Sequence, residues 1–280
     1  MQSVGNDYVF MDCFEQEIEN PEKISRNISK RRTSVGSDGL ILIMPSTVAD
    51  CRMRIFNSDG SEGRMCGNGV RCTGAYMYYK KGIKKKNIAV ETLSGICEVI
   101  IDDTKKTVTT SMPDVQLNAR SVGLCTDYIL GGKYIDAQKE QIINKYIIVN
   151  KRKIIVNCVS VGNPHCVLFF DKIPGNIEKM SSWLKSENIF KNGINIEYVS
   201  VTDERSAVAR VYERGSGETT GCGSGACAIA VASVLTGRFR KNNWNSIFFP
   251  GGELKVMIEE NGKIYLQGET FIAFEGSVDI

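Results

Sequence analysis

The sequence predicts an α+β protein (α/β in some schemes) made of two pseudo-symmetric domains, each a strand-rich, barrel-like shell around a central helix. Three observations predict this fold: a motif that occurs twice, runs of alternating or β-branched residues in both halves, and one helix after each copy of the motif. With 280 residues, the chain is long enough for two domains of ordinary size.

The duplicated motif reads "EGRMCGNGVRC" at Glu62–Cys72 and "TTGCGSGACA" at Thr219–Ala228. In each copy a cysteine is followed by Gly, a small polar residue and Gly, and then by a helix-forming run. Offsets of 156 and 157 positions also align other parts of the halves, namely Cys66 with Cys222, Asn57 with Glu213, Glu62 with Glu218, Asn6 with Asn163, and "LSGICEVIID" with "PGGELKVMIE". Four elements in the same order at nearly one offset indicate two copies of one fold.

The elements of each half follow from local patterns. Residues 88–102 and 145–161 alternate or are β-branched with turn residues between them, which predicts strands. The run after Cys222 is small and apolar on every side, which predicts a helix buried all round that ends at Gly237, as its counterpart ends at Gly82. Residues 177–190 resemble an amphipathic surface helix. Only four residues precede Gly5, where the second half has a strand, so we expect the first strand to lack a part.

Composition excludes several classes of protein. A net charge of +3 is too small to indicate nucleic-acid binding, and the basic run at Lys80–Asn87 is better explained as a solvated loop. No signal peptide is apparent, and the most apolar stretch, Ala226–Leu235, is too short to span a membrane, so we expect a cytoplasmic protein without membrane contact.

The ten cysteines do not predict a disulfide scaffold in a chain of this size without a secretory signal. A metal site is not expected either, because the chain has no C-x-x-C and a single histidine, His165. No glycine-rich dinucleotide fingerprint occurs, and we therefore expect no cofactor.

Cys66 and Cys222 are each placed at a predicted helix N-terminus. Free backbone N–H groups and the helix dipole favour a thiolate there, so we expect the thiol pKa to fall from about 8.5 toward neutrality. The same groups form an anion site, which the glycines let a ligand approach. If two like domains pack about a pseudo-two-fold axis, the two thiols face each other. One could then remove the α-proton of a carboxylate-bearing carbon while the other delivers a proton to the opposite face.

Each feature also has a structural explanation. A lone Cys-Gly-x-Gly is more often a tight turn, and a lone cysteine is more often part of a core. The matched pair favours function, since packing gives no reason for cysteine at both positions. For His165, beside Asn163 in a duplicated loop, the functional and structural explanations are about equal. Glu213 ends a strand ahead of Cys222, where a solvated carboxylate is the default.

The chain resembles the diaminopimelate epimerases over nearly its whole length. The motifs that carry the resemblance are "GNDYVFMD", "RIFNSDGSEGRMCGNGVRC", "VGNPHCV", "GINIEYV", "VYERGSGETTGCGSGACA" and "PGGELKV". The resemblance implies cofactor-independent interconversion of LL- and meso-diaminopimelate, in lysine and peptidoglycan precursor synthesis. It implies that Cys66 and Cys222 are the acid/base pair, with His165 assisting Cys66 and Glu213 assisting Cys222. It further implies that the substrate is bound by Asn6, Asn57, Gly67, Asn68, Asn163, Asn195, Glu213, Arg214, Gly223 and Ser224, with Arg214 against the distal carboxylate.

The resemblance also implies a domain division and a homodimer. The first half would comprise 1–114 and 270–280, because the last strand, near Phe271–Ile280, returns to it, and the second half would comprise 115–269. Two positions depart from the family. Gly39 stands where some members carry a substrate-binding Gln, and Phe274 stands where some place a tyrosine at the dimer contact.

Three rival functions remain open at this point. A racemase of the same fold could act on another amino acid, although the motif around Arg214 argues against it. A redox-active dithiol protein would use the cysteines as a reversible disulfide and would exchange no α-hydrogen. A binding module for acidic amino acids would tolerate Cys→Ser at both sites.

Overall fold

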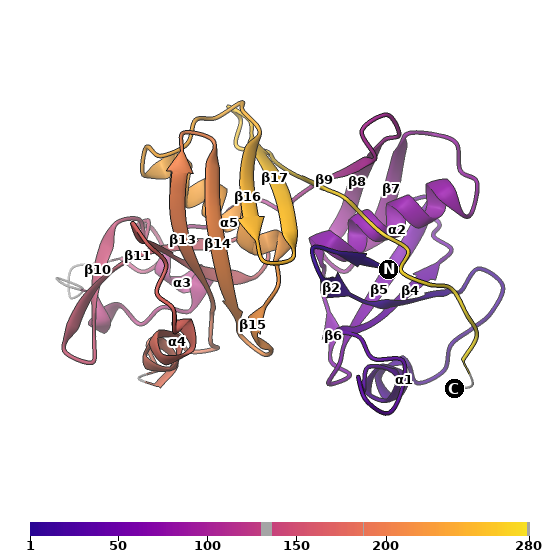
Figure 1. Ribbon diagram of the computed structural model, residues 1–280, viewed down its shortest axis with the longest axis horizontal. Coiled ribbons are helices and arrows are strands. Elements are labelled where there is room, and N and C mark those ends of the chain that lie inside the picture. The colour runs from indigo at the N-terminus through magenta and orange to yellow at the C-terminus, as the bar shows by residue number, and fades with distance from the viewer. Residues whose placement is uncertain (130–135, 187, 279–280) are drawn as a thin grey trace. The chain divides into compact units, whose positions relative to one another are not determined.

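The computed structural model describes residues 1–129, 136–186 and 188–278. The chain forms two compact units, Met1–Met112 with Tyr265–Ile280 (unit 1) and Pro113–Ile264 (unit 2) (Figure 1). The predicted halves, 1–114 with 270–280 and 115–269, place these boundaries a few residues later in the sequence. Residues 130–135, 187 and 279–280 fall within the predicted domains, and residues 187 and 279–280 also fall within the predicted surface helix and last strand. These residues lie outside the described part of the chain.

Unit 1 is a set of strands around the helix α2. Its elements are β1 (Gln2–Ser3), β2 (Asn6–Asp7), β3 (Val9–Asp12), α1 (Pro21–Ile28), β4 (Gly39–Met44), β5 (Cys51–Asn57), β6 (Glu62–Gly63), α2 (Gly67–Tyr79), β7 (Asn87–Thr92), β8 (Gly95–Asp102), β9 (Thr107–Ser111) and β18 (Ile264–Gly268). The order β3-β4-β5-β7-β8-β9 is parallel at β3–β4 and β5–β7 and antiparallel elsewhere. Helix α2 packs on β7, β8 and β9, and residues of α2 and these strands share one buried core.

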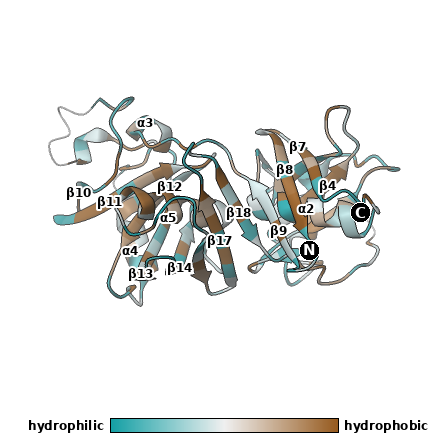
Figure 2. Cartoon of the chain, turned by 90° about the horizontal axis from the view of Figure 1, so that it is seen from above, coloured by the Kyte–Doolittle hydropathy of each residue, from teal (hydrophilic) through white to brown (hydrophobic). Residues whose placement is uncertain are grey.

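Unit 2 repeats the plan around the helix α5. Its elements are α3 (Ala119–Val122), the 3₁₀ helix η1 (Thr126–Tyr128), β10 (Lys145–Val149), β11 (Arg152–Ser160), β12 (Pro164–Phe169), α4 (Ile177–Ser186), β13 (Asn195–Asp203), β14 (Ser206–Glu213), β15 (Gly217–Thr219), α5 (Gly223–Leu235), β16 (Asn245–Phe249) and β17 (Gly252–Ile258). Apolar stretches, drawn in brown, run along β11 and β12 (Figure 2). Helix α5 packs against β11, β12 and β17.

The strand pairings confirm the predicted duplication. The order β12-β13-β14-β16-β17 is parallel at β12–β13 and β14–β16 and antiparallel at the other two steps, which is the pattern of β3-β4-β5-β7-β8. In both units a two- or three-residue strand, β6 or β15, pairs with the strand that precedes the central helix. Two unrelated folds would not be expected to share this whole series of parallel and antiparallel strand pairings.

The central helices and hairpins also agree with the sequence. All but one of the residues from Gly223 to Ser233 in α5 are buried, because small side chains let surrounding strands approach on every side. Gly237 and Gly82 follow the two helices at φ values of 75° and 74°, in the left-handed region that favours glycine. The predicted strand segments form the hairpins β7–β8 and β10–β11, and Asn150 and Lys151 turn the second with positive φ at both positions.

The surface helix and the basic loop are confirmed as well. Helix α4 buries Ile177, Ser181 and Leu184 while its other described side chains are at least partly exposed. The basic run lies between the end of α2 and the start of β7, and Lys85 pairs with Asp50 at 2.6 Å. The first strand, β1, has two residues, whereas the corresponding stretch of unit 2 is the end of the longer β11.

The prediction of a last strand near Phe271–Ile280 is wrong, because the described residues of this range form no strand. The strand that joins unit 1 is β18, which pairs antiparallel with β9 from Tyr265 to Gly268. Its alternation buries Ile264, Leu266 and Gly268, and this burial fixes the register. Farther along, Phe271 makes only an isolated bridge with Gln2, and Phe274 is 69% exposed.

We predict that Gly39→Gln, which restores the residue some family members carry, will destabilise unit 1. A Cβ at Gly39 would lie 2.1 Å from the backbone oxygen of Phe56 and 2.9 Å from Tyr8, so the backbone must move to admit any side chain. Forcing a side chain into packed space typically costs about 1–3 kcal/mol. Urea unfolding of the variant measures this loss. Gly276→Gln is the matched control, since nothing lies within 4 Å of a Cβ there. Equal stability of the two variants would contradict the prediction.

Candidate active site

Both cysteines of the duplicated motif are helix N-caps with the same backbone. Cys66 precedes α2 with φ −137° and ψ 118°, and Cys222 precedes α5 with φ −135° and ψ 121°. The carbonyls of the two residues accept the first helical bonds, from Val70 and Ala226. The free N–H groups at the start of each helix therefore point toward the space beside each thiol. This confirms the placement that the sequence predicts for the two cysteines.

In unit 1, Cys66 belongs to a network of amide side chains. The Sγ atom of Cys66 donates to Oδ1 of Asn6 at 3.7 Å, and the same oxygen accepts from Nδ2 of Asn68 at 3.3 Å. Nδ2 of Asn6 donates to Asp38 at 2.8 Å, and Asp38 pairs with Arg31 at 2.7 Å. Because Asn6 is held at both ends, its carbonyl fixes the direction of the Cys66 thiol.

Arg71 supports this network from inside the unit. Its side chain is fully buried in α2, and its Nη2 donates to Oδ1 of Asn68 at 2.9 Å and to Oγ of Ser3 at 2.7 Å. A buried cation is costly unless it is hydrogen-bonded. Arg71 thus orients Asn68, which in turn bonds Asn6 beside Cys66.

In unit 2, Cys222 is buried among polar and acidic groups. Its Sγ atom accepts from the backbone N–H of Gly225 at 3.4 Å and lies 3.5 Å from Oγ of Ser224. Burial, followed by the carboxylates of Glu213 and Glu197, raises the pKa of Cys222 well above its ordinary value, although the bonds from Ser224 and Gly225 oppose this. The expected fall of this pKa toward neutrality is therefore wrong for Cys222, since desolvation outweighs the helix end. Cys222 holds its proton at neutral pH.

His165 lies in β12 with both ring nitrogens occupied. Nδ1 is 2.6 Å from Oε1 of Glu197, and Nε2 is 3.0 Å from Oδ1 of Asn163. The side chains of His165 and Glu197 are both 0% exposed. Two acceptors on one ring suit an imidazolium, or a neutral ring if the Asn163 amide is turned.

The strand ends of unit 2 place three more predicted residues together. Nδ2 of Asn195 donates to the carbonyl of Pro164 at 3.1 Å, and its Oδ1 accepts from the backbone N–H of Arg214 at 2.9 Å. Asn195 therefore ties β12 and β13 to the residue after β14. Glu213, at the end of β14, accepts from Oγ1 of Thr219 at 2.5 Å. The side chain of Arg214 is exposed and donates to the carbonyl of Asn192 at 3.2 Å.

Each unit thus gathers its own share of the predicted residues. Unit 1 brings together Cys66, Asn6 and Asn68, with Gly67 in the first turn of α2. Its Asn57 ends β5 and bonds Ser61 at 2.9 Å in the following turn. Unit 2 holds the remaining predicted residues, which are Asn163, His165, Asn195, Glu213, Arg214, Cys222, Gly223 and Ser224. Both residues that are expected to assist proton transfer, His165 and Glu213, are in the unit of Cys222.

Sequence reasoning missed Arg71 and Glu197. Both carried a usable signal, because each is a charged residue inside a run that is otherwise buried: Arg71 in "GNGVRCTGA" and Glu197 in "INIEYV". Arg, Lys, Asp and Glu are almost never fully buried unless they are paired. A charge in such a run predicts a partner in the interior.

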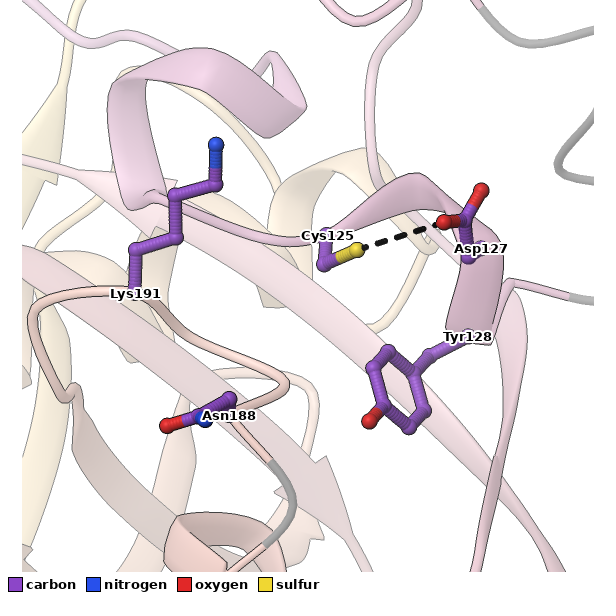
Figure 3. A pocket seen from close by; sticks show the side chains of 5 residues that line it. All are labelled: Cys125, Asp127, Tyr128, Asn188 and Lys191. Atoms are coloured by element: carbon purple, nitrogen blue, oxygen red, sulfur yellow. Dashed lines mark hydrogen bonds between the residues drawn. The ribbon is translucent and has the colours of Figure 1, made fainter.

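A pocket lined by none of the predicted residues opens in unit 2. It is lined by Cys125, Asp127, Tyr128, Asn188 and Lys191, where η1 meets the chain after α4 (Figure 3). The Sγ atom of Cys125 lies 3.9 Å from Oδ2 of Asp127. None of these residues was predicted to act.

Within residues 1–129, 136–186 and 188–278, no group of three or more His, Cys, Asp or Glu side chains is arranged to hold a metal ion. In the same part of the chain, no helix combines the length and apolarity needed to cross a membrane.

Comparison with solved structures places the fold. The chain superposes on a hydroxyproline epimerase of Agrobacterium vitis with a TM-score of 0.67 and 12% identity, covering 96% of this chain and 87% of that one. It superposes on a Bacillus anthracis protein of the PhzF phenazine-biosynthesis family with a TM-score of 0.65 and 18% identity, covering 96% and 92%. These neighbours share the two-unit, strand-rich architecture and confirm the predicted fold class.

Comparison of sequences identifies the family. A protein named diaminopimelate epimerase from Acetivibrio thermocellus is 39% identical over all of this chain and 97% of its own length. One of the same name from Methanococcus maripaludis is 38% identical over all of this chain and 98% of its own. The profile described as diaminopimelate epimerase matches residues 1–117 and 157–272. With both cysteine motifs inside the matched ranges, the chain belongs to the diaminopimelate epimerase family.

Proposed function

We propose that the protein interconverts LL- and meso-2,6-diaminopimelate by a two-base mechanism that uses no cofactor, in lysine and peptidoglycan precursor synthesis. The observation that carries the proposal is the pair of cysteines with matched backbone at the N-termini of two duplicated helices. The names of the relatives supply the substrate.

The chemistry follows from the thiols. One thiolate removes the α-proton from one face of the carbon, and the opposite thiol delivers its proton to the other face. The electron pair left on the α-carbon is shared with the carboxylate, which the backbone N–H groups of Gly67, Asn68, Gly223 and Ser224 would hold. Since burial and two carboxylates keep Cys222 protonated, Cys222 is the donor when Cys66 is the base. The reverse reaction exchanges these roles.

The remaining predicted residues have three kinds of role in this proposal. Asn6 and Asn195 spend their side-chain groups on protein partners, which supports a role in placing Cys66 and Arg214. Asn57, Asn163 and Arg214 would contact the substrate, and Arg214 would meet its distal carboxylate. His165 and Glu213 would assist proton transfer.

Deuterium incorporation tests the proposal directly. The protein is incubated with LL-diaminopimelate in D₂O, and we expect deuterium at the α-carbon together with the meso isomer. Dialysis against a chelator and treatment with a carbonyl-trapping reagent should leave the rate unchanged. Exchange on another amino acid but not on diaminopimelate would favour a racemase of the same fold. Absence of any α-exchange would favour the dithiol or binding-protein alternatives.

We also propose that the protein is a cytoplasmic homodimer. Three apolar side chains near the C-terminal end of the chain are exposed, Phe271, Phe274 and Val278. By the resemblance, Phe274 stands where some family members place a tyrosine at the dimer contact. Phe274→Asp should convert the dimer to a monomer in sedimentation or light scattering. An unchanged mass would remove Phe274 from the contact.

A further inference from the structure

Glu197 is an acidic residue in a place where acid is costly. It lies in β13 between Ile196 and Tyr198, and all three side chains are 0% exposed. Burying a carboxylate costs several kcal/mol unless its partners compensate. One oxygen faces Nδ1 of His165 at 2.6 Å, but Oε2 has no hydrogen-bond partner among the described residues. A pair that served only stability would be expected to satisfy both oxygens.

The same carboxylate reaches the helix end that carries Cys222. A Cβ on Gly225, in the first turn of α5, would lie 3.0 Å from Oε1 of Glu197 and 3.4 Å from Sγ of Cys222. The separation of this oxygen and this sulfur cannot exceed the sum of the two distances. Glu197 therefore lies beside both His165 and Cys222.

The duplication provides an internal comparison for this position. The parallel pairings Val9↔Leu40 and Cys166↔Ile196 make Ile41 the counterpart of Glu197, and the offset makes Tyr8 the counterpart of His165. In unit 1, a Cβ on Gly69, the counterpart of Gly225, would lie 2.7 Å from Cδ1 of Ile41. An apolar side chain thus fills the same place in the other copy. Replacing a buried ion pair by apolar residues is often neutral or stabilising, so packing does not require the acid.

We propose that Glu197 is a positioning residue of the Cys222 half of the site, orienting the His165 ring and keeping the Cys222 thiol protonated as the proton donor. This inference rests on the proposed function and deepens it. Nδ1–H of His165 donates to Glu197, so the ring turns its Nε2 edge toward Asn163. The negative charge beside the helix end opposes ionisation of Cys222.

Other ionisable groups near this interior are accounted for. Glu213, from β14, also opposes the Cys222 thiolate, and Ser224 and Gly225, from α5, support it. The Cys166 thiol, from β12, and the Tyr198 hydroxyl, from β13, also lie in this core. They stay protonated near neutral pH, because the hydrogen bond with Cys158 and burial raise the pKa of Cys166, and burial raises the pKa of Tyr198. Glu197 is thus the acidic group that unit 1 lacks at this position.

The experiment compares Glu197→Gln with Glu197→Asp and with Glu218→Gln. Gln keeps the size of the side chain and removes its charge, and Asp keeps the charge. Glu218 is an exposed acid in the same unit, paired with Arg210 at 2.7 Å, and serves as the matched control. The ultraviolet absorbance of the Cys222 thiolate is followed against pH, as the difference between each protein and the same protein with Cys222→Ser. Deuterium exchange into diaminopimelate gives kcat and KM.

We expect the Cys222 titration to move to lower pH by roughly one unit or more in Glu197→Gln. We also expect kcat to fall by about tenfold or more while KM changes little, since Cys222 is no longer held protonated and the His165 ring is no longer held in its orientation. Glu197→Asp should largely restore both, and Glu218→Gln should change neither. An unmoved titration with unchanged kcat would overturn the proposal. The titration uses no substrate, so it separates this failure from failure of the proposed function.

A second variant keeps the test valid if Glu197→Gln folds poorly. The double variant His165→Tyr with Glu197→Ile recreates the interior of unit 1. Its unfolding temperature should equal or exceed that of the native protein. In that background the Cys222 titration should again move to lower pH. A titration that stays in place in the folded double variant would overturn the proposal in the same way.

Discussion

Replacing either Cys66 or Cys222 with Ser should reduce epimerisation by roughly 10²–10⁴-fold or more, the cost of losing a general acid or base. A serine hydroxyl is far less acidic than a thiol, and each thiol serves one face of the α-carbon. Full epimerisation needs both, so neither variant can turn over normally. Deuterium exchange and formation of the meso isomer measure the loss.

One-sided reactions separate the two thiols. Eliminating a β-halogen from a substrate analogue needs proton abstraction from one face only. We expect Cys66→Ser to process one diastereomer of the analogue and Cys222→Ser to process the other. If both variants keep or lose elimination from the same diastereomer, the thiols do not act on opposite faces, and the reason we give for the duplication is wrong.

Cys125→Ser is the matched control for this experiment. Cys125 is half-buried like Cys66, but it lies at η1 beside Asp127 rather than at the end of a duplicated helix. It should retain full activity. A large loss in this variant would show that serine substitution harms the protein by a route other than the two-base chemistry.

The fold was predictable because its strongest signal is internal. A motif that recurs at a fixed offset reports the duplication whatever the local propensities are, and the motif's glycines and helix-forming run locate α2 and α5. The hairpins β7–β8 and β10–β11 were predictable from periodicity, because one face of each paired stretch is buried and the alternation of residues marks that face. The last strand was misplaced because it was inferred from resemblance, whereas the alternation of Ile264 and Leu266 marks the strand that pairs with β9.

Sequence reasoning named the residue types of the proposed site but not its electrostatics. Helix-end reasoning treats Cys66 and Cys222 alike, because their backbones and motifs are alike. The environments differ at positions to which sequence reasoning gave no role, although both lie inside quoted motifs: Glu197 of unit 2 replaces Ile41 of unit 1, and Arg71 of α2 corresponds to Cys227 of α5. Burial and the carboxylates of Glu213 and Glu197 raise the pKa of Cys222, and both depend on which strands surround the helix.

Arg214 should make the protein selective for a substrate with a distal carboxylate. Its backbone N–H is fixed by Asn195, and its stem packs on Gly193, where a Cβ would lie 3.0 Å from its Cγ atom. The guanidinium can therefore be aimed while its remaining N–H groups bind a carboxylate in a bidentate manner. Gly193, at φ 67°, is needed for this approach.

The size of this selectivity depends on how deeply the pair formed by Arg214 and the distal carboxylate is buried. For a buried guanidinium, loss of the partner costs about 2–5 kcal/mol. Arg214 is exposed in the free protein, so water can solvate an unpaired guanidinium and the low end of this range applies. We expect kcat/KM for lysine, which lacks the distal carboxylate, to be lower than for diaminopimelate by about 2 kcal/mol, or about 30-fold.

Arg214→Met tests the cause of this selectivity. The variant should lose activity on diaminopimelate while its slow exchange of lysine changes little, so the ratio between the two substrates should approach one. Arg210→Met, which removes a half-buried arginine of β14 that pairs with Glu218 of β15, should leave the ratio as it is in the native protein. If the native protein exchanges the α-hydrogen of lysine as fast as that of diaminopimelate, Arg214 does not read the distal carboxylate. Selectivity would then have to come from residues nearer to the α-carbon.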